Sequence, residues 1–329
     1  MLNVQDIGEH GLLKKLQSFC PANIVGDDGA VLTTDPHCSL VVTTDVLVDG
    51  VHFSDRTTTA YDVGWRATAA NLSDLAAMGA KPLGITVGLS LPGEVAVSWV
   101  EELYRGMFDC LSKYQTSIVG GDICRSQVIT VAITAIGQVA PHRVISRHNA
   151  RIGDAIVVTG LHGLSRGGLE LLLHPDLGAS LTKMERERLI KAHQRPTPRL
   201  DVISWLEKNA PNVNIAGMDS SDGLADAIAQ ICQCSQVGAE IKTDSCKILP
   251  SLVKLAGTET AFDWMLYGGE DFELVLSVPP EITSALVEYL GQDGGIIGRV
   301  VSHSGITLIN RKEGNLPQKL NLIRRFQHF

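Results

Sequence analysis

The sequence predicts an α/β fold divided into two domains, and three observations support this. Helical and strand patterns alternate along almost the whole chain. The length of 329 residues exceeds what a single domain usually contains. A composition of 44% hydrophobic and 19% charged residues supplies a large core. We place the boundary near residue 145, so that residues 1–145 form an N-terminal domain and residues 146–329 a C-terminal domain.

In the N-terminal half, strands and helices are expected in turn. The β-branched segment 41–44 predicts a strand that ends at Asp45. The Ala-rich segment 62–78 has helical spacing and stops at Gly79, which places Asp74 in the last turns of a helix. The remaining expected elements are a strand over 85–91, a helix over 94–114, a strand over 117–119 that ends before Asp122, and a strand over 128–139.

The C-terminal half shows the same alternation after a turn over residues 149–154. Its short β-branched segments predict strands over 155–159, 274–278 and 296–300. Its amphipathic segments predict helices over 167–173, 182–192, 198–209 and 223–233.

Charge and cysteine content exclude several classes of protein. The chain has 28 basic and 36 acidic residues and no basic run, so no nucleic-acid partner is expected. The seven cysteines form no CxxC pair, which is typical of reduced thiols in the cytoplasm. An acidic beginning, with Asp6 and Glu9, and the lack of any apolar run of about 20 residues predict neither export nor a membrane span.

Acidic side chains recur in small, glycine-rich segments, and this recurrence is the strongest functional signal. A single Asp beside Gly or Ser usually closes a turn or caps a helix. If four such carboxylates converge, each like-charge pair at about 5 Å costs roughly 3 kcal/mol at an effective dielectric of about 20, so bound cations are required. The segments are Gly26–Gly29, Thr43–Asp45, Asn71–Asp74, Gly120–Asp122, Asp219–Gly223 and Gly268–Asp271.

Two of these segments allow more than one interpretation. Asp27 and Asp28 point to different sides of an extended backbone, so at most one of them enters a given site. Asp74 would be partly buried in an apolar helix, and a buried acid is either paired with another side chain or bound to a metal. Both roles remain open for Asp74.

Oxygen ligands of this kind predict Mg²⁺ and phosphate chemistry, because Mg²⁺ is held by carboxylates together with substrate phosphates. The chain has no G-x-x-x-x-G-K-[ST] motif and no protein-kinase signatures. The phosphates would instead meet backbone N–H groups of Gly120–Asp122 and of the helix start after Asp222, with an arginine nearby. A calcium loop over 219–230 is excluded. Its third position is Ser221, where Asp or Asn is needed, and its twelfth is Gln230, where a bidentate Glu is needed. No H-E-x-x-H or G-x-S-x-G motif is present.

Taken together, six segments resemble thiamine-monophosphate kinase in order and spacing across nearly the whole chain. They are Gly26–Val31, Thr43–Phe53, Asn71–Gly79, Gly120–Asp122, Met218–Leu224 and Tyr267–Leu274. The superfamily includes aminoimidazole ribonucleotide synthetase and selenophosphate synthetase. The resemblance implies a two-domain α/β subunit with mixed sheets, which forms a homodimer through the sheet of its N-terminal domain. It also implies phosphorylation of thiamine monophosphate to thiamine diphosphate, with ATP as co-substrate and several Mg²⁺ ions.

The resemblance further implies roles for residues that match the family's motifs. The N-terminal domain would bind ATP and Mg²⁺, and the C-terminal domain would complete the nucleotide and substrate site. Asp45, Asp122 and Asp219 would be catalytic, through the metal ions that they hold. The metal ligands would be Asp28, Thr44, Asp45, Asp74, Asp122, Asp219 and Asp222. ATP would contact Tyr104, Gly121, Asp122, Arg147 and Ser221, whereas thiamine phosphate would contact His52, Glu270 and Phe326. Structural roles are left for Asp27 and Asp271.

Other interpretations are weaker but remain open. A selenophosphate synthetase would need a reactive Cys or selenocysteine in a glycine-rich loop near the N-terminus, whereas Cys20 lies beside Pro21. A hydrogenase-maturation relative would end in a reactive cysteine, whereas the last one here is Cys246. A non-catalytic module that binds Mg²⁺ or nucleotide and regulates a partner would share the acidic motifs but show no turnover. For His52, Tyr104 and Phe326 the structural alternatives are surface hydrogen bonding, helix packing and core packing.

Overall fold

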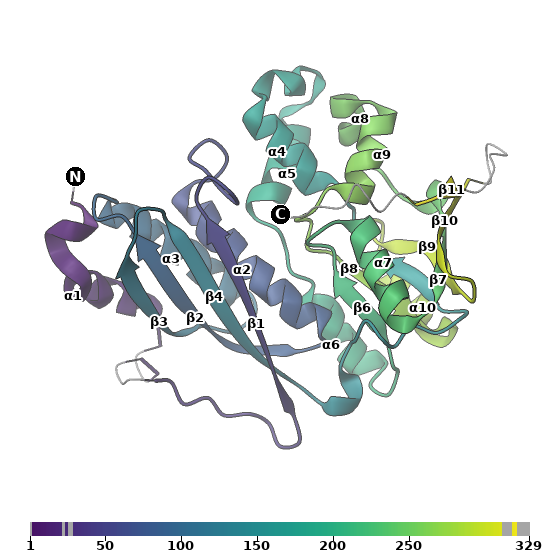
Figure 1. The fold of residues 1–329 in the computed structure, drawn as a ribbon, viewed down its shortest axis with the longest axis horizontal. Helices are drawn as coiled ribbons and strands as arrows, with labels where there is room; N and C mark the ends of the chain where they lie inside the picture. Colours follow the sequence, from purple (N-terminus) through teal and green to yellow (C-terminus); the bar gives the residue numbers. More distant parts are fainter. Residues whose placement is uncertain (1, 22–23, 26–28, 311–317, 321–329) are drawn as a thin grey trace. The chain divides into compact units, whose positions relative to one another are not determined.

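The structure, a computed structural model, describes residues 2–21, 24–25, 29–310 and 318–320. It contains two compact units (Figure 1). The N-terminal unit consists of Met1–Leu75 and Ala80–Pro141, and the C-terminal unit of Ala76–Gly79 and His142–Phe329. Each unit is built around its own mixed sheet, which confirms the α/β prediction. No helix in the described part of the chain is long and apolar enough to cross a membrane.

The N-terminal unit is built on a sheet with the strand order β1-β4-β2-β3. Its strands are β1 (Ser39–Val48), β2 (Lys81–Leu91), β3 (Ile118–Arg125) and β4 (Thr130–Val139). β4 pairs antiparallel with β1 and β2, whereas β2 and β3 are parallel. Residues of β2 and β4 alternate between buried and partly exposed positions. This alternation is typical of a sheet with one covered face.

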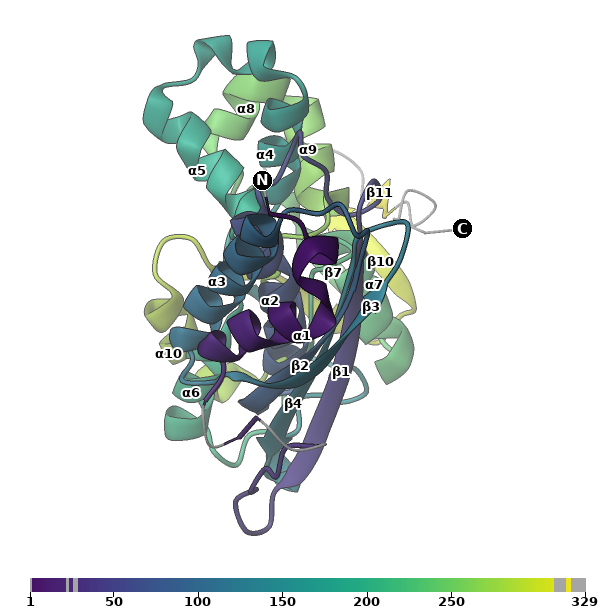
Figure 2. The same cartoon turned by 90° about the vertical axis from the view of Figure 1, so that its left-hand side faces the viewer.

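Helices cover one face of this sheet (Figures 1 and 2). They are α1 (Val4–Leu16), α2 (Ala60–Ala77) and α3 (Val97–Ser112), with a short 3₁₀ turn over Gln17–Phe19. α2 and α3 pack backbone against backbone at two glycines. A Cβ atom on Gly64 of α2 would overlap the carbonyl oxygen of Leu103, and a Cβ on Gly106 of α3 would overlap that of Tyr61. Only glycine at both positions therefore permits this close approach.

Two strands continue beyond the ends that the sequence predicts. β1 runs through Asp45 to Val48, and β3 runs through Asp122 to Arg125, so neither acid follows a strand end. The predicted end of β3 at residue 119 is wrong, because Gly120 and Gly121 lie within the strand and not in a turn. A Cβ on Gly121 would overlap the carbonyl oxygen of Val87 in the parallel neighbour, so this glycine allows close approach inside the sheet.

The C-terminal unit is built on a second sheet with the strand order β11-β10-β7-β9-β5-β8-β6 in its described residues. β7 and β10 are parallel, and the other neighbours in this order are antiparallel. The strands are β5 (Ala155–Val158), β6 (Ala216–Asp219), β7 (Gly238–Lys242), β8 (Leu274–Val278), β9 (Gly295–Val301), β10 (Gly305–Ile309) and β11 (Gln318–Lys319).

The helices of this unit pack into two apolar clusters. One lies between the sheet and α7, and it includes Met218, Ile228 and Val275. The other joins α4, α5, α8 and α9 through Leu171, Leu189 and Leu252. The helices are α4 (Leu164–Leu173), α5 (Lys183–Gln194), α6 (Leu200–Asn209), α7 (Leu224–Ser235), α8 (Pro250–Ala256), α9 (Thr258–Tyr267) and α10 (Pro280–Leu290), with 3₁₀ turns over Pro141–Arg143, Pro175–Ser180 and Thr243–Ser245.

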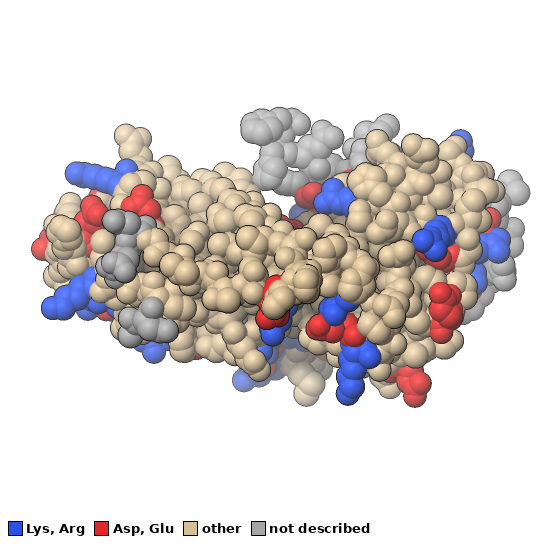
Figure 3. Space-filling view, turned by 90° about the horizontal axis from the view of Figure 1, so that it is seen from below, with Lys and Arg blue, Asp and Glu red and all other residues tan. Residues whose placement is uncertain are grey.

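Charged side chains are scattered over the molecular face drawn in Figure 3. Basic and acidic groups alternate there with uncharged residues, and the described basic side chains of that face form no broad patch. Elsewhere in the described residues, charged side chains form exposed ion pairs, such as Lys254 with Glu185 at 2.6 Å. Pairs of this kind contribute little to stability.

Candidate active site

In the N-terminal unit, β1 and α2 bring together two of the predicted acidic segments. The Thr43 hydroxyl donates to Asp74 Oδ2. The Asp45 N–H donates to Asn71 Oδ1 at 3.3 Å, and the Asn71 amide is fixed by donating to the Ala67 carbonyl at 2.9 Å. Asn71 and Asp74 are three residues apart on α2 and therefore share one face. The structure thus places Asp45 and Asp74 on the helix side of the sheet.

Asp122 lies on the other side of the same sheet. In the strand pairing, Asp122 of β3 lies opposite Gly88 of β2. Gly88 lies opposite Ala132 of β4, and Ala132 lies opposite Val46 of β1, so these four residues share one face. Asp45 is level with Ile133, which is fully buried under the helices. Because successive side chains alternate between faces, Asp122 and Asp45 point to opposite faces. β1 and β3 are also the two edge strands, so one chain does not bring these two carboxylates together.

Thr44 and Gly121 complete the predicted residues of this sheet. The Thr44 hydroxyl lies 2.8 Å from that of Thr134, on the face opposite to Asp45. Gly121 contacts the backbone of Val87, as described above. The backbone of Gly121, the predicted nucleotide contact, is therefore held in place by the sheet.

His52 lies in the turn that follows β1. Its Nδ1 accepts a hydrogen bond from the Val48 N–H at 3.1 Å, which assigns the ring proton of the neutral form to Nε2. The His52 carbonyl accepts from Nη1 of Arg66 at 3.0 Å, and Arg66 is only 2% exposed. The imidazole is thus fixed by its own turn and by α2.

Of three further predicted site residues, Tyr104 lies within the described residues, whereas Asp28 and Phe326 do not. Tyr104 on α3 is 5% exposed, its ring lies 6.1 Å from that of Phe19, and burial raises the pKa of its hydroxyl. Packing accounts for this environment, so the predicted nucleotide contact of Tyr104 stays a prediction. Asp28 and Phe326 lie outside the described residues, as does Asp27.

In the C-terminal unit, two predicted segments form one interlocked loop pair. The Ser220 N–H donates to the Glu273 carbonyl at 2.8 Å, and the Glu270 N–H donates to the Ser221 carbonyl at 2.7 Å. A Cβ on Gly269 would overlap that same Ser221 carbonyl oxygen. β6 and β8 pair Asp219 with Leu274 directly beside these contacts. The loop over 219–222 and the loop over 268–273 therefore hold each other in position.

The acids of this loop pair differ in exposure. Asp219 is 3% exposed, and its Oδ1 accepts a hydrogen bond from the Ser221 hydroxyl at 3.0 Å. Asp222 is exposed at the turn that precedes α7. Glu270 is partly exposed, and its Oε2 lies 3.9 Å from Nδ1 of the buried His193. Glu270 has a φ of 64°, which is uncommon for a residue with a side chain and is held by the contacts described above.

Asp271 has the structural role that the sequence predicted. Its carboxylate accepts from the N–H groups of Gly163 at 2.6 Å and Ser165 at 2.8 Å, at the beginning of α4. Burial raises the pKa of Asp271 to about 7, and these N–H donors oppose that shift. A helix begins with N–H groups that lack partners within the helix, so Asp271 acts as a cap from a distant segment.

Arg147 is positioned by α7. Its Nη1 donates to Gln230 Oε1 at 2.7 Å, and Gln230 Nε2 donates to Asp226 Oδ2 at 2.5 Å. The sequence analysis named Arg147 as a candidate site residue but named neither Gln230 nor Asp226. The only sequence signal for the contact between Gln230 and Asp226 is their spacing of four residues on a helix.

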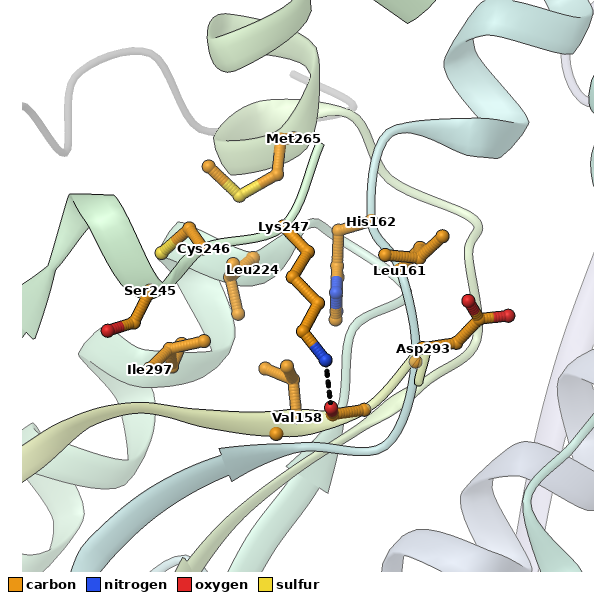
Figure 4. Close-up of a pocket in the computed structure, with 13 residues that line it drawn as sticks. Val158, Leu161, His162, Leu224, Ser245, Cys246, Lys247, Met265, Asp293 and Ile297 are labelled. Carbon is orange, nitrogen blue, oxygen red and sulfur yellow. Dashed lines mark hydrogen bonds between the residues drawn. The ribbon is translucent and has the colours of Figure 1, made fainter. Parts of the chain in front are cut away.

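A separate small pocket of the C-terminal unit is lined by His162, Lys247 and Cys246 among others (Figure 4). Burial lowers the pKa of His162 to about 4, so this imidazole is neutral at pH 7. Lys247 Nζ donates to the carbonyls of Gln292 and Gly294. The pocket has room for about one water molecule, and none of the predicted site residues lines it.

The donor atoms of the candidate site suit a hard cation. The described site offers carboxylate, hydroxyl and amide oxygens, and these are the ligands that suit Mg²⁺. Within each unit, however, the described residues contain no group of three or more His, Cys, Asp or Glu side chains placed to hold one metal ion. The chemistry of the residues fits Mg²⁺, and further ligands would come from phosphate oxygens and water.

Comparison with known proteins first defines the class. Residues 26–139 match the model of the AIR synthase related protein N-terminal domain. Residues 151–310 match that of the AIR synthase related protein C-terminal domain. The chain is therefore a two-domain AIR synthase related protein.

Individual relatives are more specific. The thiamine-monophosphate kinase of Synechococcus elongatus is 47% identical over 99% of this chain and 98% of its own length. The crystal structure of that kinase from Stenotrophomonas maltophilia has a TM-score of 0.80 at 34% identity, covering 90% of this chain and 95% of its own. A structure of AaThiL complexed with AMPPCP and TMP has a TM-score of 0.77 at 32% identity, covering 100% and 99%. The chain belongs to the thiamine-monophosphate kinase family, which confirms the resemblance.

Proposed function

We propose that this chain transfers the γ-phosphoryl group of ATP to the phosphate of thiamine monophosphate, giving thiamine diphosphate and ADP. The observation that carries the proposal is the interlocked loop pair, in which Glu270 donates its N–H to Ser221 at 2.7 Å. This contact joins a segment predicted to bind metal and nucleotide to one predicted to bind the acceptor. The similarity to AaThiL, a protein seen with AMPPCP and TMP, extends over the whole chain and supports the same pair of ligands.

The proposal assigns the site residues by group. Asp45, Asp122 and Asp219 hold the metal ions on which catalysis depends. The other metal ligands are Asp28, Thr44, Asp74 and Asp222. ATP contacts Gly121, Arg147 and Ser221, with Tyr104 as a further contact, and the acceptor contacts His52, Glu270 and Phe326. The oxygen-only character of the metal ligands supports Mg²⁺ as the ion.

The reaction follows from the charges of its two substrates. The attacking oxygen belongs to a phosphate that is already ionised at pH 7, so no side chain has to act as a general base. As this oxygen bonds to the γ-phosphorus, the bond to the bridging oxygen of ADP breaks. When bound, Mg²⁺ neutralises charge on both phosphates. The carboxylates would hold those ions and so align donor and acceptor, and Arg147 would add positive charge. Consumption of ATP supports a cytoplasmic location.

We further propose a homodimer that forms through the open face of the N-terminal sheet. Leu40, Val42 and Val46 of β1 lie on this face and are 58%, 62% and 44% exposed. A row of exposed apolar side chains on a sheet favours association.

Gel filtration tests this dimer. The wild type is expected to elute at the dimer volume. Val42→Glu places a charge in the row of exposed apolar side chains on β1, so it is expected to shift elution toward the monomer volume. A wild type that elutes as a monomer would contradict the dimer.

The overall function is tested by direct product analysis. Incubation with ATP, Mg²⁺ and thiamine monophosphate is expected to yield thiamine diphosphate and ADP in equal amounts, measured by mass spectrometry. Omission of Mg²⁺ with a chelator present should abolish both products. ADP formation with a different acceptor only would reject the substrate assignment. No turnover despite ATP binding would favour a regulatory nucleotide-binding module.

A further inference from the structure

The segment that contains Arg147 is anchored to the far end of α7. The Ser235 hydroxyl donates to the Arg147 carbonyl at 2.6 Å, and it accepts from the Ala150 N–H at 3.0 Å. One side chain therefore fixes the backbone on both sides of His148 and Asn149. This leaves the long Arg147 side chain, which is exposed, to be oriented separately.

The Arg147 side chain is oriented through an amide that has a fixed direction. Gln230 directs its Oε1 to the Arg147 guanidinium at 2.7 Å and its Nε2 to the Asp226 carboxylate at 2.5 Å. Asp226 is only 6% exposed, so the acid that sets this direction is itself held by packing. With the opposite amide orientation both contacts would be repulsive, because a carbonyl oxygen would face the carboxylate and an NH₂ group would face the cation.

The amide has an electrostatic consequence as well. If Arg147 paired directly with Asp226, its charge would be largely neutralised. Gln230 lies between them, so it aligns the guanidinium but carries no charge of its own. An Arg side chain that is already ordered loses less conformational freedom when it binds an anion. Within the described residues, the Arg147 guanidinium donates to Gln230 through one of its five N–H groups, and the planar group can offer others to a phosphate.

We propose that Gln230 is a positioning residue, which holds the Arg147 guanidinium ready for the nucleotide phosphates while Asp226 fixes its amide. The inference rests on the proposed function insofar as it takes ATP to be the ligand of Arg147. Gln230 itself need not touch ATP. Its contribution is exerted through Arg147, and it should therefore vanish when Arg147 is absent.

The matched variants are Gln230→Ala and Gln233→Ala. Both change a glutamine of α7 to alanine, a good helix former, so the helix should be retained in each. Gln233 is exposed, and no side-chain hydrogen bond is recorded for it in the described part of the chain. The dissociation constant of Mg²⁺-ATP is measured by calorimetry for both variants, for Arg147→Ala and for the double variant Arg147→Ala/Gln230→Ala, and the thermal midpoint is recorded for each.

Gln230→Ala is expected to weaken ATP binding about three- to tenfold, and Gln233→Ala less than about twofold. In the Arg147→Ala background, Gln230→Ala should add no further loss. In steady-state assays, Gln230→Ala should raise the KM for ATP and leave kcat and the KM for thiamine monophosphate nearly unchanged.

Two outcomes overturn the inference. One is an ATP affinity of Gln230→Ala equal to that of Gln233→Ala. The other is an effect of Gln230→Ala that is undiminished without Arg147, which would indicate a general structural role. Failure of the wild type to form thiamine diphosphate rejects the proposed acceptor alone, since the ATP affinities of the variants still decide the role of Gln230.

Discussion

Asp122→Asn is expected to lower turnover by at least about a hundredfold while the fold is preserved. The amide keeps the shape of the side chain but loses the charge that would hold Mg²⁺ on the phosphates. Asp122 lies exposed on β3, so its neutralisation removes no described buried contact. The measurement is kcat at saturating ATP and thiamine monophosphate over a series of Mg²⁺ concentrations, with circular dichroism to confirm the fold.

Glu94→Gln provides the control for charge. Glu94 is also an exposed acid of the N-terminal unit, located in the turn before α3, and lies outside every predicted site segment. Its neutralisation should leave kcat within about twofold of the wild type. If Asp122→Asn keeps near-normal turnover at saturating Mg²⁺, Asp122 is not a catalytic metal ligand.

Gly64→Ala should destabilise the N-terminal unit by at least about 3 kcal/mol. The added methyl group would overlap the Leu103 carbonyl oxygen, and that oxygen belongs to α3 and cannot move without shifting the helix. Alanine has the higher helix propensity by about 1 kcal/mol, but this gain is smaller than the cost of separating two packed backbones. Urea unfolding monitored by circular dichroism measures the change.

Gly29→Ala serves as the comparison. It makes the same chemical change in the same unit, and its added Cβ atom would meet no atom of the described residues within 4 Å beyond its chain neighbours. Its unfolding free energy should stay within about 1 kcal/mol of the wild type. Equal midpoints for the two variants would show that the backbones of α2 and α3 are not in contact at Gly64.

Local sequence patterns predicted much of the fold. The predicted helix over 62–78 corresponds to α2, and the predicted strands over 128–139 and 274–278 correspond to β4 and β8. These segments have strong periodicity, which depends only on near neighbours in sequence. Helices α1, α8, α9 and α10 were missed, and of these only α8, with seven residues, has too few turns to show a period.

The candidate site was predicted by residue type but not by pairing. Recurrent acids identified Asp45, Asp74 and Asp219, whereas the bond of Thr43 to Asp74 depends on how β1 lies over α2. The sequence also could not show that Asp122 faces away from Asp45, since this depends on strand register across the entire sheet. Partners from distant segments become visible only after the strands are aligned.

The interlocked loop pair also constrains the order in which this protein folds. β6 is an edge strand whose described ladder is formed with β8, so the segment that contains Asp219 must wait for residues 274–277 before it acquires its shape. Contacts between residues so far apart in sequence form slowly. During synthesis, the Asp219–Asp222 loop therefore cannot take its native conformation until β8 has left the ribosome. A chain truncated before β8 would carry this acidic motif in full and still lack its geometry.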